Sequence, residues 1–99
     1  MEHTGHRERL RMRFEQNQLN GFSDHEVLEL MLTYAIPRVD VNPLAHRLMD
    51  RFGSLSGVME ATAGELMQVK GMGERSAAFI TMLLPVLRRY RKDRLTVRT

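Results

Sequence analysis

The sequence predicts a small all-α fold, a bundle of five to six helices that form one domain. Three observations indicate this fold. Strand-like alternation is not sustained anywhere, helix-capping patterns recur, and turn residues interrupt the chain about every ten to fifteen residues. A chain of 99 residues has room for one domain with a modest hydrophobic core.

The first half of the chain contains the signals for two helices. A first helix is predicted from about Gly5 to Gln16, before an Asn-Gly turn. Ser23 and Glu26 then form a capping box, which opens a second helix. That helix is apolar nearly all round, so we expect it at the centre of the bundle. Pro37 ends it, because the residue before a proline disfavours helical angles.

The next helices are marked by caps at both ends. Asn42 is the expected N-cap of the third helix, with Pro43 at its first helical position and Gly53 as its C-terminal cap. A short connector helix follows. Thr62 and Glu65 form a second capping box, which opens the helix that leads into the next loop.

The last helix is predicted to run from Glu74 past Tyr90. Pro85 lies inside it, lacks a backbone N–H and is expected to bend the helix or split it in two. Residues 93–99 show no helical pattern and are expected to be a linker or tail. The domain is therefore predicted to span residues 1–92.

Two helix-loop-helix units repeat weakly along the chain, at about residues 23–52 and 62–91. The loop of the first unit, residues 36–42, has no glycine, and its Asp40 places negative charge where a phosphate would bind. We therefore interpret the first unit as degenerate and structural, and the second as the binding unit.

Composition and charge narrow the functional classes. The chain has no cysteine, which excludes disulfides and thiolate metal sites. It has no long apolar run and no signal peptide, so we expect a cytoplasmic protein without a membrane partner. The formal net charge is +3, and arginines gather at both ends of the chain. They form either solvated helix faces or an electrostatic footprint for a polyanion, with Arg7, Arg11, Arg88 and Arg89 as supporting contacts.

The most informative stretch joins a short helix to a small-residue helix through Gly71-Met72-Gly73. Glycines leave the N–H groups of such a loop uncovered, and the N-terminus of the next helix adds unpaired donors and partial positive charge. The predicted phosphate site consists of the following residues: Lys70, Gly71, Met72, Gly73, Arg75 and Ser76. Met72 is expected to point into the core. The alternative is that the glycines only make a tight turn.

Other candidate sites are weak. His3 and His6 have helical spacing but no carboxylate partner, while His25 and His46 are expected to face solvent. No nucleophile and base stand together, so the sequence predicts no catalytic residues, metal, cofactor or small-molecule substrate.

The glycine hairpin resembles the helix-hairpin-helix motif, which grips the DNA backbone without reading bases. Four further segments resemble, in order, the N-terminal domain of RadC-type proteins, which carry a DNA-repair label: residues 5–11, 29–38, 42–45 and 51–55. The resemblance implies a tandem helix-hairpin-helix module that precedes a JAB/MPN-type metalloprotease-like domain. The His-x-His pair of that domain is absent from this sequence, so its hydrolase chemistry is not expected here.

Two functions follow from these observations. The first is a non-sequence-specific DNA-binding module, with duplex or branched DNA favoured over single strands. The second is a protein-interaction or homodimerisation module without DNA affinity, for which the segment around Leu87 and Tyr90 would supply an apolar patch.

Overall fold

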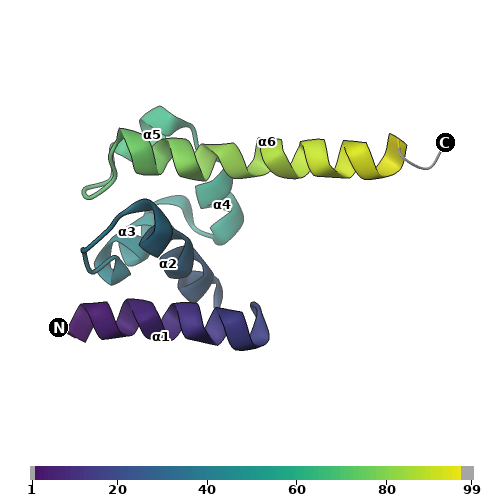
Figure 1. Cartoon of the computed structure of the whole chain (residues 1–99). Coiled ribbons are helices and arrows are strands. Elements are labelled where there is room, and N and C mark those ends of the chain that lie inside the picture. Colours follow the sequence, from purple (N-terminus) through teal and green to yellow (C-terminus); the bar gives the residue numbers. More distant parts are fainter. Residues whose placement is uncertain (1, 97–99) are drawn as a thin grey trace.

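The computed structural model describes residues 2–96 and the side chains of residues 5–96. The described residues form helices and loops without a strand, which confirms the all-α prediction. The helices are α1 (Glu2–Asn17), α2 (Asp24–Ala35), α3 (Asn42–Phe52), α4 (Leu55–Glu60), α5 (Ala63–Met67) and α6 (Glu74–Thr96). In Figure 1, α1 and α6 lie along opposite edges of the molecule, α2 to α4 lie between them, and α5 lies beside the N-terminal end of α6.

Helix ends follow the local sequence signals closely. Ser23 and Thr62 each accept a hydrogen bond from the N–H three residues on, and both capping boxes are complete. Gly53 ends α3 in the left-handed region with φ 85°. The cap of α3 differs from the prediction. Asn42 is the first helical residue and makes no side-chain cap, while the Asp40 carboxylate accepts the Asn42 N–H at 3.1 Å.

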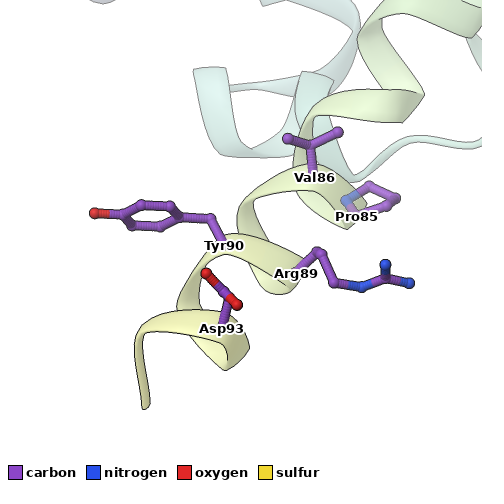
Figure 2. Close-up of a pocket in the computed structure, with 5 residues that line it drawn as sticks. All are labelled: Pro85, Val86, Arg89, Tyr90 and Asp93. Carbon is purple, nitrogen blue, oxygen red and sulfur yellow. The ribbon is translucent and has the colours of Figure 1, made fainter. Parts of the chain in front are cut away.

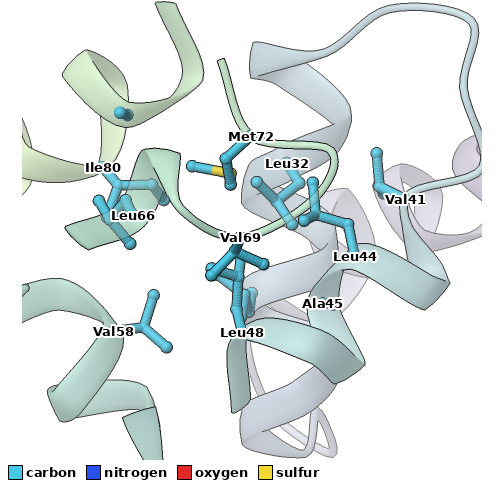
Figure 3. Packing of buried hydrophobic residues seen from close by; sticks show 12 residues of the cluster. Leu32, Val41, Leu44, Ala45, Leu48, Val58, Leu66, Val69, Met72 and Ile80 are labelled. Atoms are coloured by element: carbon cyan, nitrogen blue, oxygen red, sulfur yellow. The ribbon is translucent and has the colours of Figure 1, made fainter. Parts of the chain in front are cut away.

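The hydrophobic core is built around α2, as its apolar sequence predicted. Leu28 and Leu32 of α2 are fully buried, and Leu48 of α3 and Ile80 of α6 pack in the same cluster. Figure 3 shows side chains of α2 to α6 and of the hairpin converging there. Burying one leucine stabilises the fold by about 1.5–3 kcal/mol, so this cluster fixes the position of the hairpin loop.

The last helix differs from the prediction at both its proline and its end. α6 continues as one helix from Glu74 through Pro85 to Thr96, so the expected split does not occur. Pro85 is exposed beside a surface hollow that Thr81 also lines, so water can reach the carbonyl that the proline leaves unpaired. Residues 93–96 of the expected tail are helical, and residues 97–99 lie outside the described part of the chain.

Candidate nucleic-acid interface

The hairpin between α5 and α6 is a tight turn that requires one glycine. Met72 donates its N–H to the Val69 carbonyl at 3.0 Å, and Gly71 has φ 102°. A Cβ on Gly71 would lie 3.2 Å from Leu44 Cδ1 and 3.1 Å from Arg47 Nη2. A side chain at this position would therefore be strained by both its backbone angle and its neighbours.

Gly73 has a different role from Gly71. Its φ is not positive, and a Cβ built on it would meet no atom within 4 Å. Its carbonyl accepts the first helical hydrogen bond of α6, from the Ala77 N–H at 3.0 Å, so Gly73 caps the helix. Its own N–H is donated to Ser76 Oγ at 3.0 Å. The position therefore needs open space in front of the helix and not an unusual backbone angle.

The structure removes two predicted contacts from direct phosphate binding. Ser76 is 3% exposed, and its hydroxyl donates to the Gly73 carbonyl while accepting the Gly73 N–H. These two groups therefore close the first turn of α6 internally. The N–H groups of Glu74, Arg75 and Ser76 precede the first helical hydrogen bond of α6, and like the Gly71 N–H they pair with no acceptor among residues 2–96. They are the donors that remain for an anion.

Met72 fills the predicted core position between the two glycines. Its side chain is 8% exposed and belongs to the main hydrophobic cluster, with Val69 and Leu66 beside it (Figure 3). This apolar contact anchors the turn, so the backbone on its outer side is held in a fixed position. Met72 is thus a supporting residue of the hairpin and does not contact a ligand.

Arg47 is a cation at the hairpin that sequence reasoning missed. It is exposed on α3, and its Nε donates to the Lys70 carbonyl at 3.0 Å. Its Nη2 lies against Gly71. Lys70 and Arg75 are also exposed, so three cationic side chains surround the turn. No local pattern marks Arg47, because the contact joins residues 23 positions apart.

Arg7 and Arg11 are not available to a polyanion. Arg7 is 8% exposed, and its guanidinium donates to the carbonyls of residues 33, 36 and 39. Burial lowers the pKa of Arg7, and the charge of Arg11 lowers it further. Arg11 donates to the Thr33 carbonyl at 2.7 Å and lies over the Tyr34 ring. Both arginines satisfy carbonyls at the C-terminal end of α2, so they hold α1 in place.

Arg88 and Arg89 are not brought to the hairpin either. They are exposed on the outer half of α6. Thirteen residues separate Arg88 from Arg75, which corresponds to about 20 Å along a helix. Of the four predicted supporting arginines, the two on α1 bind carbonyls within the protein and the two on α6 lie far from the hairpin. Arg47 of α3 is the arginine that contacts the hairpin from another helix.

Two histidines lie beside one buried carboxylate, and a third stacks on one of them. Glu29 is 2% exposed, its Oε2 lies 2.7 Å from His6 Nε2, and its Oε1 lies 3.6 Å from His25 Nδ1. The rings of His25 and His46 are 3.9 Å apart. The expectation that His25 faces solvent is therefore wrong, because this ring packs between α2 and α3. His3 lies outside the side chains that the structure describes.

This histidine cluster is not arranged as a metal centre. Among the described side chains, no group of three or more His, Cys, Asp or Glu residues is placed to hold a metal ion. The Glu29 carboxylate instead ties α1 to α2 through His6. Within residues 2–96, no helix has the length and hydrophobicity needed to cross a membrane.

Comparison with known proteins identifies the family. Residues 1–78 match the family described as UPF0758 N-terminal. The chain belongs to the UPF0758 family. It is 43% identical over 82 residues to a UPF0758 protein of Fusobacterium nucleatum, and 48% identical over 69 residues to one of Ruegeria pomeroyi. This membership confirms the RadC-type resemblance.

The UPF0758 relatives are longer than this chain. The aligned regions cover 83% and 70% of this chain but only 35% and 31% of the two relatives. The chain thus spans about a third of the length of the curated relatives it matches. The family match includes the hairpin and ends at residue 78, before the outer half of α6. No solved structure matches the chain significantly.

Proposed function

We propose that this UPF0758 domain is a non-sequence-specific DNA-binding module without catalytic activity of its own. The hairpin at residues 70–75 grips a backbone phosphate. The N–H groups of Glu74 and Arg75 donate to the anion, and the positive end of α6 stabilises its charge. Arg47, Lys70 and Arg75 supply the surrounding positive charge.

The observation that carries this proposal is the open space in front of Gly73. No atom would lie within 4 Å of a Cβ at this position, although it lies directly before the unpaired N–H groups of α6. Lys70 and Arg75 are within three residues of it along the chain, and Arg47 contacts the neighbouring Gly71. Glu74 is the only carboxylate among residues 68–76, and it can turn to solvent because it is exposed. An open position beside unpaired helix donors leaves room for a phosphate oxygen.

The chemistry of the hairpin favours backbone contacts over base recognition. Residues 68–76 contain no aromatic side chain on which an unstacked base could rest. Phosphate contacts position a protein without reading sequence. Duplex or branched DNA is therefore the expected ligand. With two or three neutralised phosphates, the slope of log affinity against log salt should be about −2 to −3.

A fluorescence-anisotropy titration tests the proposal. Labelled duplex, branched and single-stranded DNA are titrated at low and near-physiological salt. The key variant is Gly73→Val, because its side chain would fill the open position without straining the backbone. Gly64→Val is the matched control, since Gly64 is equally open but lies on α5.

Opposite results from the two valine variants are expected. Gly73→Val should bind duplex DNA at least about tenfold more weakly than the parent, a loss of about 1.4 kcal/mol, whereas Gly64→Val should bind like the parent. Circular dichroism should show the same helix content in all three proteins. Unchanged affinity in a folded Gly73→Val protein would rule out the hairpin as the phosphate site. If the parent protein binds none of the DNA ligands at low salt, the DNA-binding function is ruled out.

A second candidate function is a protein-interaction or homodimerisation module. The observation in its favour is the outer half of α6, where Leu87 and Tyr90 are 46% and 59% exposed. Light scattering separates the two forms of this role, because a homodimer has twice the mass of the monomer and a module for other partners remains monomeric.

A further inference from the structure

The outer half of α6 is a helix without tertiary cover. Every residue from Pro85 to Thr96 is helical and exposed. Figure 2 shows that Pro85, Val86, Arg89, Tyr90 and Asp93 all project from this single helix. An isolated helix of this length is marginally stable in water, because helices in proteins are stabilised mainly by packing of an apolar face. This segment therefore has an unused face that a partner would stabilise.

The unused face is apolar along one side of the helix. Leu83, Val86 and Tyr90 are three and seven residues apart, which places them on one stripe, with Leu87 beside them. Val86, Leu87 and Tyr90 are 56%, 46% and 59% exposed. This spacing of apolar residues is that of a seam between two packed helices. We call these four residues the α6 stripe.

The α6 stripe leads into an apolar groove. Phe79 lies seven residues before Val86, on the same side of α6, and forms one wall of the groove. The other lining residues come from α1, α2 and the loop between them: Phe14, Leu19, Val27, Leu30, Met31 and Tyr34. Leu19 and Tyr34 are 46% and 59% exposed at this site. Groove and stripe together form one elongated apolar surface.

Charge around the stripe determines which partner fits. Residues 88–94 contain five cations, Arg88, Arg89, Arg91, Lys92 and Arg94, and one anion, Asp93. In a two-fold antiparallel pair of α6 helices centred on Val86 and Tyr90, each flank would face its own copy, so Arg89 would approach a second Arg89. Like charges in such positions repel. A second copy of this chain is therefore a poor occupant, and an acidic partner is a good one.

The shape of the surface separates a helix from a bilayer. An anionic membrane would attract the same cations, but it presents a flat surface that cannot enter a groove walled by α1, α2 and α6. A helix can lie along the stripe and place an apolar side chain between Phe79 and Tyr34. The combination of stripe, groove and basic flanks thus favours a helical protein segment.

We propose that the α6 stripe and its groove bind an amphipathic, acidic helix of a partner protein. Apolar side chains of the partner cover Val86 and Tyr90, and its carboxylates pair with Arg89 and Arg94 at the edges of the stripe. The interface uses none of the hairpin residues, so the domain can hold its partner helix and a phosphate at the same time.

Synthetic helices test this inference on the whole chain. The probe is a labelled peptide of about three heptads with leucine at the a and d positions and glutamate at e and g. The control peptide has lysine in place of every glutamate. We expect the acidic peptide to bind with a Kd below about 100 μM and the basic peptide to bind at least about tenfold more weakly. Equal binding of the two peptides, or none by the acidic one, overturns the proposal.

Variants locate the peptide on the surface. The double substitution Val86→Ser with Tyr90→Ser should weaken acidic-peptide binding at least about tenfold, because it removes the centre of the seam. Leu95→Ser is the matched control, since Leu95 is 77% exposed but lies off the stripe. Arg89→Glu should weaken the acidic peptide and strengthen the basic one. If the double variant binds the acidic peptide like the parent, the stripe is not the site.

Two further results would assign the stripe to a different occupant, and a third separates this proposal from the DNA proposal. Concentration-dependent dimerisation without peptide, lost in the double variant, would assign the stripe to a second copy and overturn the proposal. Binding to anionic vesicles that displaces the peptide would assign it to a membrane. Gly73→Val should leave peptide affinity unchanged, so failure of the DNA proposal and failure of this one are distinguishable.

Discussion

The loops of the two helix-loop-helix units use their polar groups differently. The first loop, residues 36–41, joins α2 to α3, and the second, residues 68–73, joins α5 to α6. They lie on the same side of the molecule in Figure 1, and Gly71 of the second loop packs against Leu44 in the first turn of α3. In the first loop, carbonyls 36 and 39 accept Arg7, and the Asp40 carboxylate accepts the first N–H of α3.

The second loop leaves its helix donors open. The N–H groups of Met72 and Gly73 are paired within the hairpin, with the Val69 carbonyl and Ser76 Oγ, whereas the first N–H groups of α6 have no partner among the described residues. The comparison shows how a repeated unit acquires two roles. In the first loop, Arg7 and the Asp40 carboxylate satisfy backbone groups that a ligand would otherwise meet. The cations beside the second loop leave the N–H groups at the start of α6 free for an anion.

Substitution of Arg7 gives the largest expected effect. Arg7→Ala removes the donor to three carbonyls at a buried position, so the free energy of unfolding should fall by about 2–4 kcal/mol. Urea denaturation measures the change. Arg9→Ala is the control on an exposed position of the same helix and should change stability by less than about 0.5 kcal/mol. Equal effects of both would contradict the internal role of Arg7.

The hairpin glycines give the second largest effect. Gly71→Ala should cost about 1–3 kcal/mol, because its φ of 102° and its contacts with Leu44 and Arg47 oppose a side chain. Gly73→Ala should cost less, about 0.5–1 kcal/mol, because its Cβ would meet open space although alanine is a poorer N-cap than glycine. Thermal denaturation of the pair measures both. A larger loss for Gly73→Ala than for Gly71→Ala would show that the turn is held differently.

Local signals in the sequence were sufficient for most of the fold. Ser23, Gly53 and Thr62 act through neighbours within a few residues, so their caps could be predicted and are confirmed. Met72 was predictable as a core residue because it is the one large apolar side chain between the two glycines, and its burial is confirmed. The split expected at Pro85 does not occur, and the exposed position of this residue lets solvent reach the carbonyl that it leaves unpaired.

Contacts between distant segments limited the prediction of the site. Arginine patterns on a helix look alike whether the side chain faces solvent or a carbonyl. Arg7 reaches residues 26 to 32 positions away, and Arg47 reaches Lys70 across 23 positions. Neither contact produces a periodic pattern that could be recognised in a single sequence. The role of each cation in the two loops therefore emerges only when the helices are packed.

The smallest expected effect concerns the two capping boxes, which differ in one contact. Glu26 opens α2 and Glu65 opens α5, and each accepts the N–H of its cap residue. Glu26 also accepts Arg13 at 3.0 Å, and hydrogen bonds from Arg13 and then from the Ser23 N–H lower its pKa below the ordinary 4.5. Its ionised form therefore stabilises the fold above about pH 4.5, and this contribution is lost as the pH falls through the lower folded pKa.

Substitution by glutamine keeps the cap geometry and removes this charge. Glu26→Gln should lower stability at neutral pH by less than about 1 kcal/mol, because the pair is partly solvated, and should reduce acid sensitivity between about pH 5 and 3. Glu65→Gln should have a smaller effect, since no arginine within the described residues donates to Glu65. Urea midpoints measured across this pH range for both variants provide the test. Equal pH dependence of the two would mean that the Arg13 contact adds nothing to α1 docking, and that only Arg7 and Arg11 distinguish the first unit from the second.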